Sequence, residues 1–110
     1  MSVGARSYRI AVIAGDGIGK EVVPEGIRVL EAAAHRFGFS LLWQEFDWSC
    51  ERYAQTGRMM PVDGLQQLRP FDGIFLGAVG YPGVPDHVSL WGLLIPIRRD
   101  FQQYVNLRPV

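Results

Sequence analysis

Short apolar runs alternate with one long amphipathic segment in the first part of the chain. Residues 8–14 are almost continuously apolar and end in glycines, which is typical of a strand buried on both faces of a parallel sheet. Residues 20–37 are predicted to form a helix, because their apolar positions recur every three or four residues. Gly38 follows where a left-handed cap ends such a helix. The apolar face of the helix consists of Val23, Ile27, Leu30, Ala34 and Phe37.

The remaining pattern continues this alternation of strands and helices. Residues 39–48 and 72–80 are predicted strands, and the second of them again runs into glycines. The alternation predicts an α/β fold with a mainly parallel sheet flanked by helices. The other predicted elements are a short helix within 49–60 ending near Gly57, a short helix over 61–68, a loop over 81–89, a helix over 90–104 that contains Pro96, and the beginning of a fourth strand at 105–107.

Composition limits the possible functions. The chain has 110 residues, of which 48% are hydrophobic, so one domain can bury a core. Lys+Arg 11 balances Asp+Glu 11, which excludes nucleic-acid binding driven by counterion release. No apolar run reaches the roughly 18 residues of a membrane helix, and residues 1–7 lack the apolar stretch of a signal peptide. A single cysteine, Cys50, fits a reducing compartment, so we expect a cytoplasmic protein with neither nucleic-acid nor membrane partners.

The glycines after the first strand match neither common phosphate-binding template. The dinucleotide fingerprint G-x-G-x-x-G, begun at Gly15, requires glycine where Lys20 stands. The G-x-x-x-x-G-K-[ST] loop requires glycine at Ala14 and Ser or Thr at Glu21. One interpretation is a tight turn that needs glycine for positive φ and close packing. The other is a ligand groove, because residues 77–80 repeat the arrangement at the third strand and ligands bind at the carboxyl ends of such strands.

Arginines near the end of the chain carry the second candidate chemistry. Arg98 and Arg108 are ten residues apart, and a helix followed by a returning strand could bring them to one pocket. Two convergent guanidinium groups suit a small dicarboxylic or hydroxy acid, because each binds a carboxylate with two hydrogen bonds. Arg99 is turned about 100° away on a helix and is expected to face solvent. The alternative for each arginine is a solvated surface position.

Three ordered motifs resemble one enzyme family. Residues 13–19 followed by 21–23 resemble the amino-terminal signature of the isopropylmalate/isocitrate dehydrogenases, the β-decarboxylating hydroxyacid dehydrogenases. Residues 77–80 look like the family's cofactor-side loop, and Arg98 with Arg108 matches its substrate-arginine pair. Within the family, the resemblance is greatest to the tartrate/D-malate dehydrogenase branch, on residues 46–50, 57–61 and 85–92.

The resemblance implies an NAD-dependent oxidation of tartrate or D-malate, followed by decarboxylation with Mg²⁺ or Mn²⁺. Arg98 and Arg108 would bind the substrate carboxylates, and a bulky indole at Trp91 would leave less room for a branched apolar substituent. The family also implies a homodimer. By the same resemblance, the residues that border the nicotinamide end of NAD would be Ile18, Gly77, Ala78, Val79, Gly80, Trp91, Gly92 and Leu94.

The resemblance also implies that residues 1–110 are the amino-terminal portion of the first domain, with the rest of the enzyme absent. The family's catalytic tyrosine and lysine, third substrate arginine, metal-binding aspartates and adenosine-binding loop have no counterpart here. We therefore assign no catalytic residue and no metal ligand to this chain, and expect it to be inactive alone. Two alternatives stay open: a piece of an isopropylmalate or isocitrate dehydrogenase, or a short non-catalytic α/β protein that binds a ligand or partner.

Several other polar and sulfur-containing residues are interpreted as structural. Asp16 is expected to order its turn or to cap a helix. Cys50 lacks a neighbouring cysteine or histidine and is expected to fill the core. His35 is expected at the surface and His87 in a loop. The residues Trp43, Trp48, Met59 and Met60 are expected to serve packing.

Overall fold

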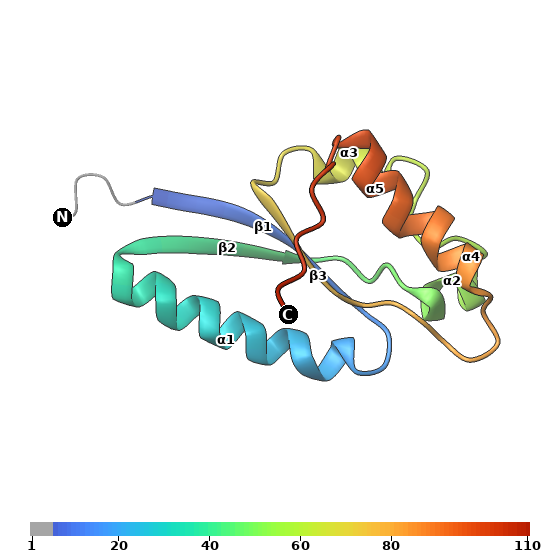
Figure 1. Ribbon diagram of the computed structural model, residues 1–110, viewed down its shortest axis with the longest axis horizontal. Coiled ribbons are helices and arrows are strands. Elements are labelled where there is room, and N and C mark those ends of the chain that lie inside the picture. Colours follow the sequence, from blue (N-terminus) through green and yellow to red (C-terminus); the bar gives the residue numbers. More distant parts are fainter. Residues whose placement is uncertain (1–5) are drawn as a thin grey trace.

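The computed structural model describes residues 6–110; the first five residues, on which part of the signal-peptide expectation rests, lie outside the described range. The described residues form a parallel sheet of three strands, β1 (Arg6–Gly15), β2 (Phe39–Glu45) and β3 (Gly73–Ala78), in the order β2-β1-β3. Figure 1 shows this sheet with helices on both sides. The predicted fold class is therefore confirmed. The buried residues of β1 are residues 11–13 and Gly15, all in the half of the strand that pairs with β3, because β3 pairs with β1 only from Ile10 onward.

Helix α1 (Gly19–Phe37) lies along one face of the sheet (Figure 1). Val23 and Ala34 are buried on its predicted apolar face. Gly38 has φ +77° and its N–H donates to the carbonyl oxygen of Ala34 at 2.9 Å, which confirms the left-handed cap. Phe37 differs from the prediction and is 74% exposed, because the helix ends there; its ring instead lies beneath the Arg36 guanidinium group.

The other helices are α2 (Cys50–Thr56), α3 (Gly64–Leu68), α4 (Asp86–Ser89), the π-helical turn Leu90–Leu94 and α5 (Ile95–Asp100). In Figure 1 they lie on the opposite side of the sheet from α1 and beyond its carboxyl end. They enclose the main core, in which the packing roles expected for Trp48, Cys50 and Met59 are confirmed. The buried residues of this core are Ala11, Ile13, Trp48, Cys50, Met59, Leu68, Leu93 and Ile97.

Strand β2 is shorter than predicted and ends at Glu45 instead of Trp48. The Phe46 N–H still donates to the carbonyl oxygen of Val12 at 2.8 Å, but the chain then turns inward. Trp48 enters the core at 2% exposure, and the Ser49 hydroxyl accepts from the Arg52 N–H at 3.1 Å to cap α2. Burial of the indole and capping of α2 thus end the strand early.

The last helical region begins earlier and ends earlier than predicted, running from Asp86 to Asp100 instead of 90–104. Pro96 has no N–H to offer to the preceding turn, and the wider π-helical turn at Leu90–Leu94 comes just before it. Gln102, at φ +54°, lies just beyond the end of α5. The fourth strand expected at 105–107 was wrong: in the described residues this segment has no strand partner, and Leu107 is 84% exposed.

Candidate cofactor and carboxylate site

The order of the strands defines where a ligand would bind. From β1 the chain crosses to β2 on one side, and β3 then pairs with β1 on the other side. In open α/β sheets the crevice outside the carboxyl ends of two such strands is the usual ligand site. The turn over residues 15–19 leaves β1 there, and residues 79–80 leave β3 beside it. The two glycine turns singled out from the sequence are therefore neighbours in the fold.

Glycines allow these two strand ends to approach closely. A Cβ atom at Gly15, where φ is +81°, would lie 1.9 Å from the carbonyl oxygen of Ala78. A Cβ at Gly19 would lie 2.0 Å from the Ala14 carbonyl oxygen, and one at Gly77 would lie 2.2 Å from the same atom. The tight-turn interpretation is confirmed at these positions. Gly77 and Ala78 belong to the end of β3, so only the second half of the expected 77–80 loop is a loop.

Asp16 joins these turns through hydrogen bonds and is 2% exposed. Its N–H donates to the carbonyl oxygen of Ala78 at 2.7 Å. One carboxylate oxygen, Oδ2, accepts from the N–H of Cys50 at 2.8 Å and from that of Gly80 at 3.3 Å, while Oδ1 accepts from the Glu51 N–H at 3.0 Å. Asp16 thus orders its turn, as expected, and caps α2 in place of the adjacent α1. No sequence signal links Asp16 to partners more than thirty residues away.

The outer surface of the same crevice is open and partly apolar. Ile18 is 64% exposed, and Gly17 and Gly80 are exposed with no atom within 4 Å of where a Cβ would stand. Cofactor pockets combine apolar side chains with a few main-chain polar groups. An exposed apolar side chain therefore lies beside unobstructed main chain at this turn.

The segment from Trp91 to Leu94 presents its side chains in different directions. Trp91 is 60% exposed, whereas Leu93 is fully buried in the core and anchors the segment. Gly92 faces Met59, whose Cγ would lie 2.8 Å from a Cβ at this position, so Gly92 serves close packing. Leu94 lines a small cavity of about 120 Å³ together with Arg98.

The two candidate substrate arginines stand on different segments. Arg98 is exposed on α5, and the other residues that line its cavity come from β3, the π-helical turn, α5 and Gln103. Arg108 lies in the irregular last segment, where its Nε donates to Asn106 Oδ1 at 3.4 Å, and it is not among the residues of that cavity. The returning strand expected to carry Arg108 is not formed.

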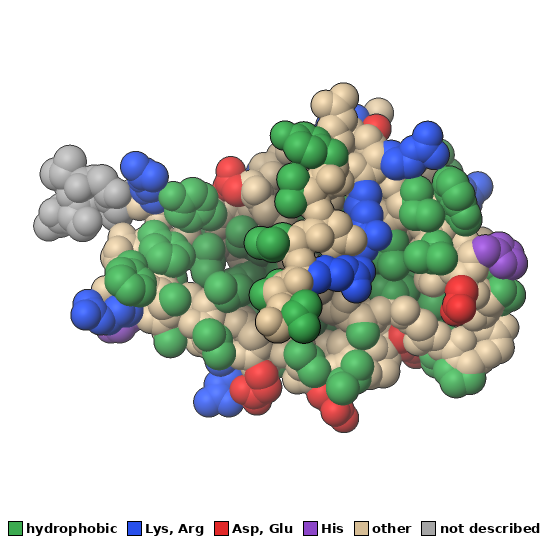
Figure 2. All heavy atoms as spheres, viewed as in Figure 1, with side chains coloured by type: hydrophobic (Ala, Val, Ile, Leu, Met, Phe, Trp, Pro, Cys, Tyr) green, Lys and Arg blue, Asp and Glu red, His purple; other side chains and the backbone are tan. Residues whose placement is uncertain are grey.

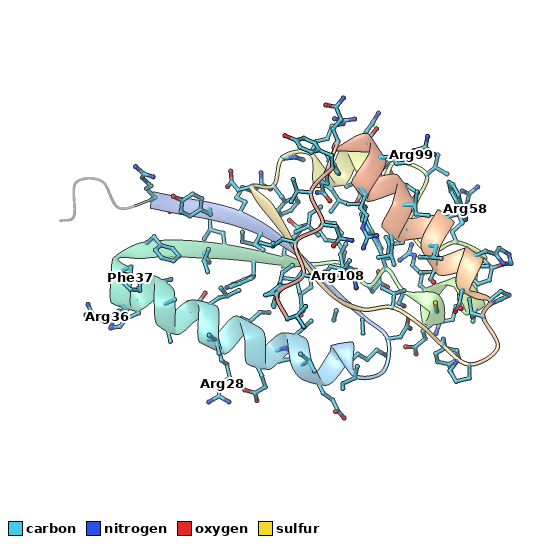
Figure 3. The ribbon with its side chains drawn as sticks, in the orientation of Figure 1. Arg28, Arg36, Phe37, Arg58, Arg99 and Arg108 are labelled. Atoms are coloured by element: carbon cyan, nitrogen blue, oxygen red, sulfur yellow. The ribbon has the colours of Figure 1, made fainter. Side chains whose placement is uncertain are left out.

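Basic side chains nevertheless gather on one face of the molecule. Figure 2 shows a small group of Lys and Arg side chains in the middle of the viewed face. Figure 3, in the same orientation, labels Arg108 at that place and Arg99 farther out along α5. Arg99 is exposed, as the sequence predicts.

A cavity of about 470 Å³ lies at the carboxyl ends of β1 and β2 beside α2, and Gly15 is among its lining residues. Sequence reasoning missed it, because it depends on where α2 packs. Its charged residues largely satisfy one another: Lys20 pairs with Glu51, which raises the pKa of Lys20, and Arg52 Nη1 pairs with Asp47 Oδ1 at 2.7 Å. We consider it a weaker ligand site than the β1/β3 crevice, because its cations already have partners.

Residues 6–110 offer neither a metal-ligand cluster nor a membrane-spanning helix. No three His, Cys, Asp or Glu side chains in that range are grouped so that they could share a metal ion. No helix in that range combines the length and the apolar character needed to cross a membrane. His35 and His87 are both exposed, and His87 lies in α4 where a loop was expected.

The sequence profile of the isocitrate/isopropylmalate dehydrogenase family matches residues 9–110, and the chain belongs to this family. It is 62% identical over 107 residues to the D-malate dehydrogenase [decarboxylating] of Escherichia coli strain K12 and 59% identical over 108 residues to the tartrate dehydrogenase/decarboxylase of Pseudomonas putida. Each alignment covers 96% of this chain and 30% of the relative, so the chain spans about 30% of the length of these relatives.

A solved structure agrees with this assignment. The apo form of a β-decarboxylating dehydrogenase from Thermococcus kodakarensis matches with a TM-score of 0.68 at 28% identity. The match covers 88% of this chain and 27% of that structure. The family and the tartrate/D-malate branch inferred from the motifs are therefore confirmed.

Proposed function

We propose that this chain is the amino-terminal portion of the first domain of a decarboxylating dehydrogenase that uses NAD and acts on D-malate or tartrate. The observation that carries the proposal is the β2-β1-β3 strand order, which brings residues 15–19 and 79–80 together where open α/β sheets bind ligands. The identity of more than half to D-malate and tartrate dehydrogenases supports this choice of substrates.

Three of the residues that the resemblance assigns to the nicotinamide end of NAD have surfaces that suit it. Ile18 and Trp91 offer exposed apolar surfaces, and Gly80 offers accessible main chain. NAD, when bound, supplies the acceptor for the hydride that leaves the hydroxyl-bearing carbon of the substrate. In this proposal the chain holds the cofactor ring in place and shields one side of it from water.

Arg98 and Arg108 would bind the substrate carboxylates. A guanidinium group holds a carboxylate with two parallel hydrogen bonds, so two of them fix both the position and the rotation of a dicarboxylic acid. This fixes which carbon faces the cofactor and which carboxylate departs as carbon dioxide. We propose that the last segment, now irregular, moves Arg108 toward Arg98 when the rest of the enzyme is present.

The proposed reaction includes a divalent cation, but we assign no residue of this chain as a ligand of that cation. A bound Mg²⁺ or Mn²⁺ would supply a Lewis acid that stabilises negative charge on the substrate oxygen. The described residues offer no cluster that could hold it, and the chain has no assigned acid or base. We therefore propose that residues 1–110 alone have no dehydrogenase activity.

A chimeric enzyme tests the proposal. Residues 1–110 of this chain replace the matching part of the E. coli D-malate dehydrogenase, and NADH formation is followed with D-malate, tartrate, isopropylmalate and isocitrate in the presence of Mn²⁺. We expect activity on D-malate or tartrate from the chimera and none from the 110-residue chain. The unaltered E. coli enzyme is the positive control.

Each other outcome points to a different conclusion. Preference of the chimera for isopropylmalate or isocitrate over the parent's D-malate would contradict the substrate assignment. A folded chimera without any activity would favour a non-catalytic binding protein. NADH production by residues 1–110 alone would show that the chain carries its own acid–base and metal groups.

A further inference from the structure

We propose that Asp16 is the positioning residue of the cofactor crevice: its carboxylate holds the Gly80 end of the β3 turn and the start of α2 against the β1 turn. This inference rests on the proposed function for the role of the crevice. The inference goes beyond the proposed function because it assigns the alignment of three segments, the β1 turn, the start of α2 and the residues after β3, to one side chain. That side chain is buried and does not itself face the open surface.

Among the described residues, the Asp16 carboxylate is the only group that is hydrogen-bonded to both of the other segments, the start of α2 and the residues after β3. Two of its donors, the N–H groups of Cys50 and Glu51, open α2, and the third belongs to Gly80. Gly80 is exposed, and it lies beyond the last residue of β3. Its N–H therefore has no sheet partner, and the Asp16 bond is what fixes it.

An uncharged isostere cannot replace this arrangement. Asparagine has one acceptor oxygen where aspartate has two. With that oxygen at the Oδ2 position, the Glu51 N–H would face an NH₂ group; with it at the Oδ1 position, both Cys50 and Gly80 would lose their acceptor. Asp16→Asn therefore keeps two of the three bonds when its oxygen takes the Oδ2 position, whereas Asp16→Ala, which has no acceptor, loses all three and separates the segments.

Two variants provide matched controls. Ser49→Ala removes the other cap of α2, in which the Ser49 hydroxyl accepts from the Arg52 N–H, without touching Gly80. Asp72→Ala removes a second carboxylate that joins distant segments, because Asp72 Oδ2 accepts from the Arg9 N–H at 2.8 Å at the opposite end of the sheet. The Ser49 variant thus loses a cap of α2, and the Asp72 variant loses a hydrogen bond between distant segments. Neither variant changes a hydrogen bond of the crevice.

The first measurement is amide hydrogen exchange in the 110-residue chain. In the unaltered chain we expect the exposed Gly80 N–H to exchange at least tenfold more slowly than an unbonded glycine N–H, which requires no variant to fold. Asp16→Ala should remove this protection, and both controls should keep it. Gly80 exchange at the rate of a free amide in the unaltered chain would overturn the proposal.

The second measurement is NAD affinity in the chimeric enzyme, read by the change in protein fluorescence on binding. Asp16→Ala should raise the Kd for NAD about tenfold, and Ser49→Ala and Asp72→Ala should leave it within about twofold. Equal weakening by all three variants would reduce Asp16 to a stabilising residue and overturn the positioning role. If the chimera binds no NAD, the proposed function fails, and Gly80 exchange in Asp16→Ala then decides the structural coupling by itself.

Discussion

The α-carbon of Gly15 faces the carbonyl oxygen of Ala78 so closely that a Cβ atom would lie 1.9 Å from it. That oxygen accepts a hydrogen bond from the Asp16 N–H at 2.7 Å, so it cannot move away without breaking the bond. Gly15 also has φ +81°, a backbone conformation that costs other residues free energy. The junction of β1 and β3 therefore depends on the absence of a side chain at this position.

Gly15→Ala should lower the free energy of unfolding strongly. The positive φ costs about 1–2 kcal/mol, and the overlap with main-chain atoms adds roughly 1–3 kcal/mol. Two control variants, Gly38→Ala and Gly19→Ala, separate the cost of the positive φ from the cost of the overlap. The free energy of unfolding of all three variants is measured by urea unfolding. Gly38→Ala has φ +77° and open space around the new Cβ, so it should show the first cost only. Gly19→Ala lacks a positive φ and meets the Ala14 oxygen, so it should show the second. Equal destabilisation by Gly15→Ala and Gly38→Ala would contradict the close approach.

Cys50 should be a poorly reactive thiol in the folded chain. Burial, together with the nearby negative charge of Asp16, raises its pKa from 9.0 to about 11. At pH 8 the thiolate fraction should be roughly a hundredfold lower than for an unshifted thiol. Alkylation by iodoacetamide should therefore be slow in buffer and fast in urea, where the thiol is exposed. Fast alkylation of the folded chain at pH 8 would contradict the burial.

The same shift gives a pH dependence of stability. The folded-state pKa lies above the unfolded value, so the contribution of the neutral thiol is complete below pH 9 and is lost as the pH rises through about 11. The difference in unfolding free energy between the unaltered chain and Cys50→Ala should shrink over this interval. Comparison of the two proteins removes the titration of lysines and tyrosines, which they share. A constant difference from pH 8 to pH 11 would rule out the raised pKa.

The elements and the site differ in how far the sequence predicts them. Hydrophobic periodicity found β1 and α1, because each keeps one pattern over many residues, and Gly38 marked the end of α1. It misplaced the end of β2, where burial of Trp48 overrides the strand preference of the local residues. The bonds of Asp16 to α2 were beyond reach, since they join residues more than thirty positions apart. Both glycine turns were found because glycine reports a local backbone constraint that is visible in the sequence.

Arg98 and Arg108 should affect the acid substrate and not the cofactor. In the chimeric enzyme, Arg98→Lys or Arg108→Lys removes a two-bond contact with a carboxylate and should raise KM for D-malate about tenfold or more. KM for NAD should stay within about twofold. Arg99→Lys is the matched control, because Arg99 is the exposed neighbour on α5 and should leave both constants unchanged. A rise in KM for NAD alone would place the arginines outside the carboxylate site.

Trp91 should set the limit on substrate size. Its indole is 60% exposed beside the buried anchor Leu93, so its removal should cost the fold less than about 0.5 kcal/mol. In the chimeric enzyme, Trp91→Val opens space for a branched apolar substituent, and a change of this size in a pocket alters discrimination about tenfold or more. We expect kcat/KM for isopropylmalate to rise relative to that for D-malate by this factor. Tyr104→Val, at an aromatic side chain that is 93% exposed in the last segment, should leave the ratio unchanged. If Trp91→Val and Tyr104→Val gave the same ratio of kcat/KM for isopropylmalate to kcat/KM for D-malate, the Trp91 indole would not face the substrate. Loss of an exposed aromatic ring far from the substrate would then have the same effect as loss of Trp91.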